Sequence, residues 1–205
     1  MQEKGFTLVE LLIVLSLISI LVSILVVIIN PGKIMSQARD AQRIGDLRNI
    51  DFATNVYIND ITNGNNLPWP TRGICSSTSA GHNFYSTPTV TSLTGWPTAL
   101  NPTGTLSVAV DGTGWVPLSF KDVTLLNLSR LPLDPRNGQV GAAANNTTVV
   151  FAYAFSCDIT NGYEYAAKLE RDVQSMINDG GNRNNCNSGA ADCLYEVGTA
   201  KATLY

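Results

Sequence analysis

Charged side chains are scarce in this sequence. Asp, Glu, Lys and Arg make up 14% of its 205 residues, against roughly 25% in a typical soluble domain. The formal net charge is only −3, so the chain has no basic excess that would favour a nucleic-acid partner. The length suffices for one ordinary domain plus a membrane anchor. Composition thus gives nucleic-acid binding no electrostatic support and leaves room for a membrane segment.

The residues that usually carry catalysis are also few. The only histidine, His82, lies in a stretch rich in Ser, Thr and Gly. The sequence contains no Gly-x-Ser-x-Gly elbow, no phosphate-binding P-loop and no His-Glu-x-x-His motif. A carboxylate pair of the glycosidase kind has no positive support. We therefore predict that the chain is not an enzyme and carries no cofactor.

The four cysteines all follow the N-terminal apolar stretch. They are Cys75, Cys157, Cys186 and Cys193. Their spacing matches no zinc signature, and an even number fits two disulfides in an oxidising compartment. Cys186 and Cys193 are close enough to close a small loop, which would leave Cys75 with Cys157. Three pairings are possible, and all three stay open at this point.

The longest apolar run extends from Phe6 to Ile29, with Glu10 as its only ionisable side chain. As a helix, this run is about 36 Å long, which exceeds the hydrocarbon core of about 30 Å. A removable secretory signal has a shorter apolar core, of 7–15 residues, and an A-x-A-like site that this sequence lacks. The run is therefore predicted to span a membrane. A carboxylate within a span costs roughly 2.5–3.5 kcal/mol, so Glu10 needs an explanation.

The charges that flank the span conflict with the cysteines. Lys4 is the only basic residue before it, whereas Lys33, Arg39, Arg43 and Arg48 follow it. The positive-inside rule would place the C-terminal part in the cytoplasm. The four cysteines and the weakly charged Ser/Thr/Asn-rich region that follows favour the extracytoplasmic side. We take the second orientation, for a reason that the N-terminal motif supplies below.

A second helix is predicted after the span. Pro31 and Gly32 should kink the first helix, and apolar residues then recur every three or four positions from Ile34 to Tyr57. Short strands are predicted at 106–110, 149–155, 163–169 and 194–197, with a hairpin at 158–162 and a short helix at 171–177. Such a sheet cannot bury both faces alone, and the amphipathic helix is the obvious cover for one face. The fold class is α+β.

The opening segment explains Glu10. Gly5-Phe6-Thr7-Leu8-Val9-Glu10, ahead of a long apolar run, resembles the cleavage site of type IV prepilins and pseudopilins. The resemblance implies that a membrane peptidase cuts after Gly5, the last leader residue, and that the new N-terminal Phe6 is methylated. It also implies that the new amine pairs with Glu10 of a neighbouring subunit during assembly. A buried carboxylate is tolerable when it meets an opposite charge.

The resemblance also implies an organisation for the chain. Residues 1–5 would be the leader, 6–29 the transmembrane and filament-core helix, 30–61 its amphipathic continuation and 62–205 a β-rich extracytoplasmic head. The expected partners are further copies of the chain, the prepilin peptidase, and an inner-membrane assembly platform with its ATPase. The subunit would be stored in the bacterial inner membrane and reach the cell surface in a filament.

Other segments extend the likeness to one pilin-like group, the major pseudopilins of type II secretion. They are 115–118, 131–135, 163–165 and 195–199. The stretch from 39–43 to 57–60 resembles the helix of pilin-like proteins that leads into the head. A major pseudopilin would carry a calcium loop near Cys186 and Cys193, but only Asp179, Asp192 and Glu196 supply carboxylates there, so no metal is predicted. The large neutral head favours a surface pilus subunit. A pseudopilin and an anchored domain that never polymerises are the alternatives.

Overall fold

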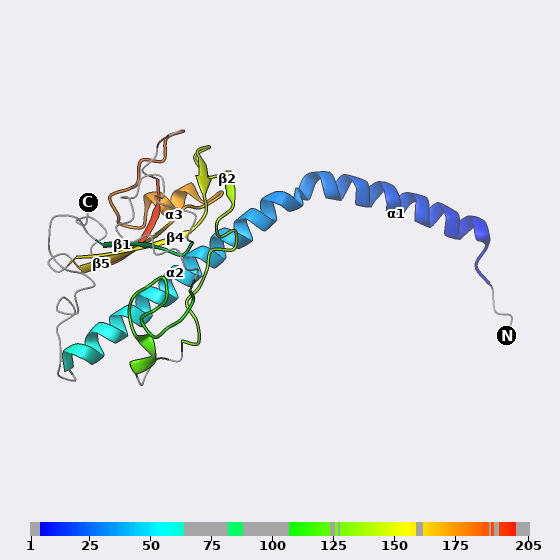
Figure 1. Cartoon of the computed structure of the whole chain (residues 1–205). Helices are drawn as coiled ribbons and strands as arrows, with labels where there is room; N and C mark the ends of the chain where they lie inside the picture. Colours follow the sequence, from blue (N-terminus) through cyan, green and yellow to red (C-terminus); the bar gives the residue numbers. More distant parts are fainter. Residues whose placement is uncertain are drawn as a thin grey trace.

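The structure is a computed structural model that describes residues 5–63, 82–87, 107–123, 126, 128–158, 162–188, 190 and 193–199. Its helices are α1 (Leu8–Ile29), α2 (Pro31–Asn63), the 3-10 helix η2 (Phe120–Asp122) and α3 (Val173–Ile177). Its strands are β1 (His82–Tyr85), β2 (Val140–Ala142), β3 (Thr148–Val150), β4 (Tyr153–Asp158), β5 (Gly162–Ala167) and β6 (Tyr195–Gly198). Two long helices thus precede a compact α+β head, as the sequence predicts (Figure 1).

A single residue separates the two long helices. Asn30 has left-handed backbone angles, with φ of 45°, a conformation that Asn tolerates better than most residues. Its carbonyl oxygen accepts a hydrogen bond from the Lys33 amide at 2.9 Å. The second helix begins at Pro31, where proline's missing N–H costs no helical hydrogen bond. The chain therefore bends at Asn30, immediately before Pro31 and Gly32.

The main sheet of the head is antiparallel, with the strand order β1-β4-β5-β6. Strands β4 and β5 form a hairpin in which Phe155 lies opposite Tyr165. Helix α2 packs against β5 and β6. Because side chains alternate along a strand, Tyr163 and Tyr165 face α2, while Glu164 points to the opposite face. The amphipathic helix covers one face of the sheet, as predicted.

The core of the head lies between α2 and the sheet. Leu47, Ile50 and Tyr57 of α2 are at most 4% exposed. They belong to one cluster with Phe155 and Trp115, and the Trp115 ring lies 6.2 Å from that of Tyr153. The core therefore begins about halfway along the second helix. The first three apolar positions expected to point inward, at residues 34, 38 and 41, are exposed instead.

The strand predicted at 106–110 is wrong for the part that the structure describes, which begins at Ser107. Ser107, Val108 and Val110 belong to no described strand and form no regular β-ladder. Their carbonyl oxygens accept hydrogen bonds from Trp115, Leu131 and Lys121, in that order. Lys121 lies in η2, and Trp115 and Leu131 lie outside the described strands, so no described strand pairs with this segment. The predicted strand 149–155 is also divided, because Phe151 and Ala152 separate β3 from β4.

Candidate functional site

The first turn of α1 is closed by its own side chains. Thr7 is the N-cap residue, and its backbone N–H and hydroxyl donate to the Glu10 carboxylate at 3.1 and 3.0 Å. The Glu10 amide donates in return to the Thr7 hydroxyl at 3.3 Å. This reciprocal capping box satisfies two of the free donors at a helix start. Glu10 therefore has a structural role within the chain besides the assembly role predicted for it.

The bond between Gly5 and Phe6 lies outside the helix. Residues 5–7 have no regular secondary structure, and Phe6 is 86% exposed. A Cβ atom added at Gly5 would meet no atom within 4 Å among the described residues. A peptidase needs an extended, uncovered backbone at the bond it cuts, and this segment provides one just before the helix begins.

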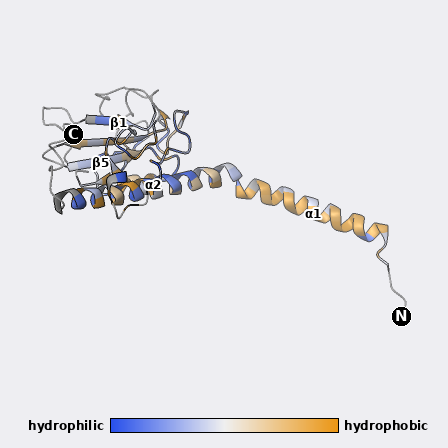
Figure 2. Cartoon of the chain, turned by 60° about the horizontal axis from the view of Figure 1, so that its bottom comes forward, coloured by the Kyte–Doolittle hydropathy of each residue, from blue (hydrophilic) through white to orange (hydrophobic). Residues whose placement is uncertain are grey.

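The surface of α1 is apolar and uncovered. Residues Leu8–Val26 have a mean hydropathy of 2.9, and none of this window is buried in the head. Figure 2 shows this helix hydrophobic along its length, with the hydrophilic surface beginning at α2. Ser16, Ser19 and Ser23 each donate to a carbonyl oxygen three or four residues earlier in the helix. Apart from Glu10, the described side chains of α1 are thus suited to lipid or to the packing of other helices.

The head is attached to α2 by a buried charged cluster, which we call the clamp: Arg39, Asp40 and Arg43 of α2 with Asp134 and Glu170 of the head. Arg43 is fully buried and donates to both carboxylate oxygens of Asp134, at 2.7 and 3.0 Å. It also donates to Asp40 at 2.8 Å and to Glu170 at 2.9 Å. Although burial alone would lower it, hydrogen bonds and charge from Asp134 and Glu170 raise the pKa of Arg43 above its usual value.

Asp40 joins the clamp to the segment before α3. Its carboxylate accepts the backbone N–H groups of Glu170, Arg171 and Asp172 at 2.8, 2.7 and 3.2 Å. Burial opposes ionisation of Glu170, but hydrogen bonds from Arg39 and Arg43 lower its pKa to about 2. Glu170 therefore stays charged at neutral pH. The clamp brings together two segments singled out in the sequence, 39–43 and 131–135.

A row of tyrosines connects the sheet to the polar side chains of α2. The hydroxyls of Tyr153, Tyr163 and Tyr165 lie 2.8, 2.6 and 2.7 Å from Asp46, Asp51 and Thr54 respectively. Arg48 donates to the hydroxyl of Tyr195 at 3.0 Å. Burial raises the pKa of all four tyrosines. These hydroxyls stay protonated and lock the helix in register on the sheet.

The opposite face of the sheet holds a second charged group. Arg183 donates to Glu164 at 3.1 Å and to Glu196 at 2.5 Å, and both glutamates are fully buried. One carboxylate oxygen of Glu164, Oε2, has no hydrogen-bond partner in the described part of the chain. Burial and the neighbouring Glu196 raise the pKa of Glu164 well above its usual range. The Arg183 guanidinium thus pairs with two carboxyl groups, and Glu164 keeps its proton.

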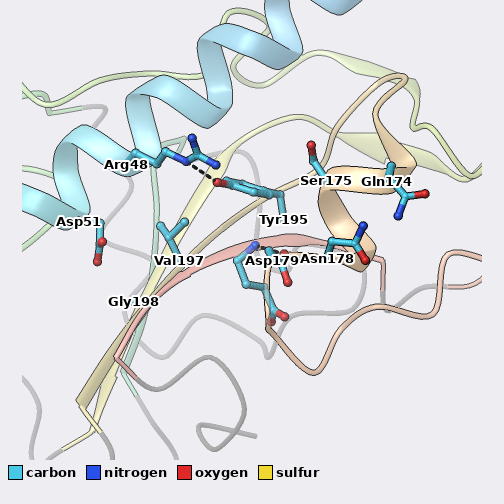
Figure 3. Close-up of a pocket in the computed structure, with 10 residues that line it drawn as sticks. Arg48, Asp51, Gln174, Ser175, Asn178, Asp179, Tyr195, Val197 and Gly198 are labelled. Atoms are coloured by element: carbon cyan, nitrogen blue, oxygen red, sulfur yellow. Dashed lines mark hydrogen bonds between the residues drawn. The ribbon is translucent and has the colours of Figure 1, made fainter.

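A polar pocket of about 470 Å³ lies between α2, α3 and β6 (Figure 3). Its acidic groups are already engaged: Asp51 accepts from Tyr163, and Asp179 accepts from the amides of Gly181 and Glu196. The Ser175 hydroxyl donates to Asp172. The lining therefore consists of structural hydrogen bonds that hold three elements together, and no serine in it faces a free base among the described residues.

One disulfide closes the loop before β6. Cys186 and Cys193 are bonded to each other, one of the three possibilities left open above. Cys157 is buried in the core and is also disulfide-bonded. Cys75 lies outside the described residues, as does Asp192. A disulfide-bonded head is the form expected in an oxidising compartment.

These features define a class of protein before any comparison is made. An exposed Gly-Phe segment precedes an apolar helix long enough to cross a membrane, and a second helix is held to a disulfide-bonded head. Residues 1–26 match the family model described as the prokaryotic N-terminal methylation motif. The chain therefore carries the motif that marks type IV pilins and pseudopilins, which are structural proteins cut by a prepilin peptidase. No curated protein and no solved structure matches the chain.

Sequence reasoning missed two parts of this arrangement. Thr7-Leu8-Val9-Glu10 has the spacing of a capping box ahead of an apolar run, a signal that could have been found from the sequence. The clamp is different, because Asp40 and Glu170 are 130 residues apart. A pair of arginines among helical positions is usually solvated, and nothing local distinguishes Arg43 from Arg48.

Proposed function

We propose that this chain is the structural subunit of a type IV filament, stored in the membrane through α1 and polymerised through the same helix after Gly5 is removed. The observation that carries the proposal is the start of α1. An uncovered apolar helix of 22 residues follows the exposed Gly5-Phe6 segment and carries one carboxylate in its first turn. Residues 1–26 match the methylation motif.

The physical argument concerns what can neutralise Glu10. Cleavage after Gly5 creates a cationic amine at Phe6, four residues before the carboxylate. An amine of an adjoining copy pairs with Glu10 when the two helices are in register, whereas a shifted copy leaves one or both charges unpaired in an apolar core. The ion pair thus sets the stagger between subunits. The same carboxylate closes the capping box while the subunit is a monomer.

Two substitutions separate these roles. Glu10→Gln removes the charge and keeps a side chain that can complete a capping box, whereas Thr7→Ala removes the cap and keeps the charge. We expect Glu10→Gln and Glu10→Ala to abolish filaments, with monomer still accumulating in the membrane, and Thr7→Ala to assemble. Filaments from Glu10→Gln cells, seen by electron microscopy, would contradict the pairing model.

Mass spectrometry of the native N-terminus tests processing directly. The expected N-terminal residue is methylated Phe6, and an intact Met1 in the membrane-extracted protein would overturn the proposal. Among filaments, we favour a surface pilus over a pseudopilus because residues 62–120 carry only Arg72 and Asp111 as charged side chains. Long filaments on the cell surface support the pilus, and short periplasmic ones support the pseudopilin. A chain that never polymerises would tolerate Glu10→Ala.

A further inference from the structure

A second cavity lies at the end of the head nearest to α1. Its volume is about 450 Å³, and it is enclosed by the second turn of α2 at Ser36 and Arg39 and by the β2–β3 hairpin at residues 142–146. In Figure 1 this hairpin lies on the side of the head from which α1 extends. The cavity therefore faces the part of the molecule where a membrane would begin.

The lining of the cavity is basic. Its ionisable side chains are Arg39, Arg136, Arg171 and Glu170. Glu170 is already hydrogen bonded to Arg39 at 2.7 Å and to Arg43 at 2.9 Å. Arg171 is exposed, and its guanidinium forms no hydrogen bond or ion pair with any residue that the structure describes. Arg136 also donates to Glu170 at 3.4 Å and to the Val140 carbonyl oxygen at 3.0 Å. The arginines outnumber the carboxylate in the lining, and the Arg171 guanidinium is left for an anion.

The position of the cavity matches the headgroup region. Ser36 follows Ile29 by seven residues, about 10 Å along a helix at 1.5 Å per residue. The polar headgroups add roughly 5–8 Å to each side of the hydrocarbon core, and an arginine side chain can reach back toward them. Lys33 precedes Ser36 by three residues and so lies on the same face of α2, one turn nearer to the membrane.

We propose that this cavity binds the phosphate of an anionic phospholipid while the subunit is stored in the membrane. Guanidinium groups recognise phosphate oxygens with paired hydrogen bonds. Arg171 supplies them here, and Arg39 and Arg136 add positive charge in the same lining. A net-negative lipid satisfies the positive excess better than a zwitterionic one. The inference rests on the membrane anchoring in the proposed function and is independent of polymerisation.

The test uses the full chain extracted from membranes in a neutral detergent. Native mass spectrometry measures its retention of short-chain phosphatidylglycerol, of phosphatidylcholine with the same acyl chains, and of inorganic phosphate alone. We expect phosphatidylglycerol to be retained best. Arg171→Gln should weaken this retention about fivefold, the size expected for one basic residue near an anionic surface. Arg130→Gln, which removes an exposed arginine that does not line the cavity, should change nothing.

Three outcomes overturn the proposal: equal retention of the two lipids, no effect of Arg171→Gln, or inorganic phosphate binding as tightly as the lipid. The last would indicate a site for free anions. Because the Arg171 guanidinium has no partner among the described residues, the variant should unfold at the wild-type temperature, so a loss of binding reports on the cavity. A chain absent from the membrane fraction would refute the proposed function instead.

Discussion

The two long helices follow each other in sequence and differ in what their side chains contact. In α1 the serines hydrogen bond to the helix backbone, and the apolar side chains contact nothing in the head. In α2 the polar side chains reach across to the head, and the apolar side chains of Leu47 and Ile50 are buried under it. The apolar surface of α1 is thus left for lipid or other helices to cover, whereas the head of the same chain covers α2.

This difference explains why the chain is helical on both sides of Asn30 although the two helices have different roles. A lipid-facing helix must satisfy its polar groups internally, because the hydrocarbon offers no hydrogen bonds. A helix of a soluble head can leave polar groups to be satisfied by partners elsewhere in the fold. Substitutions in α2 should therefore be felt as stability of the head, and substitutions in α1 as membrane or filament behaviour.

The largest effect is expected from Arg43→Ala in the clamp. The change leaves Asp40, Asp134 and Glu170 without their shared cation in a buried place, which typically costs about 3–5 kcal/mol. Chemical unfolding of the detergent-solubilised chain, followed by tyrosine and tryptophan fluorescence, measures it. Arg130→Ala, at an exposed position, should stay within about 0.5 kcal/mol. Equal effects of the two variants would show that the clamp does not hold the head on α2.

A matched pair of leucines sharpens the comparison between the helices. Leu47 of α2 is fully buried, whereas Leu17 of α1 is 57% exposed. Leu47→Ala should lower the free energy of unfolding of the head by roughly 3 kcal/mol through lost burial and a cavity. Leu17→Ala should leave that free energy unchanged in the same experiment. A destabilised head in the Leu17 variant would mean that α1 and the head are not independent.

The smallest effect, and the one that depends on pH, is expected at Glu164. The folded head keeps this proton, whereas the unfolded chain releases it near the ordinary value of 4.5. The contribution of Glu164 to stability is therefore full below that value and is lost as the pH rises toward its higher folded pKa. Glu164→Gln should stabilise the head at pH 8 by about 1–3 kcal/mol, and the gain should vanish near pH 4.

Glu170→Gln is the control with the opposite sign. The pKa of Glu170 is lowered to about 2, so its contribution is present above its unfolded pKa and is lost as the pH falls toward 2. This variant should be less stable than wild type at neutral pH and approach it in acid. Urea unfolding of both variants between about pH 2 and pH 9 gives the two slopes. Parallel curves for Glu164→Gln and wild type would show that Glu164 is ionised in the folded head.

Much of the fold could be predicted because it depends on local patterns. The apolar run, the proline after it, the hairpin between β4 and β5 and the short helix before Asn178 all carry signals within a few residues. The segment at 107–110 could not be predicted, because its alternating apolar pattern suits a strand but its hydrogen-bond partners, at positions 115, 121 and 131, lie outside the described strands. Period and propensity describe a segment and do not identify its partners.

The residues of the candidate site also fall into those that the sequence could identify and those that it could not. Gly5, Phe6 and Glu10 stand close together in sequence and could be singled out there. The clamp depends on which helix face meets the head, so Arg43 became distinguishable only when Asp134 was placed beside it. This also bears on the conflict over orientation: of the basic residues after the span, Arg39 and Arg43 are engaged by head carboxylates. Their charge belongs to the folded head as well as to the flank of the span.

The left-handed Asn30 has a mechanical consequence. Since no helical hydrogen bond of α1 continues into the head-bearing helix, the tilt of one can change by rotation about the backbone bonds of a single residue. When α1 is pulled out of the lipid, the force reaches the head through the backbone of Asn30. The head can then reorient as an intact body, and none of its internal contacts need to open.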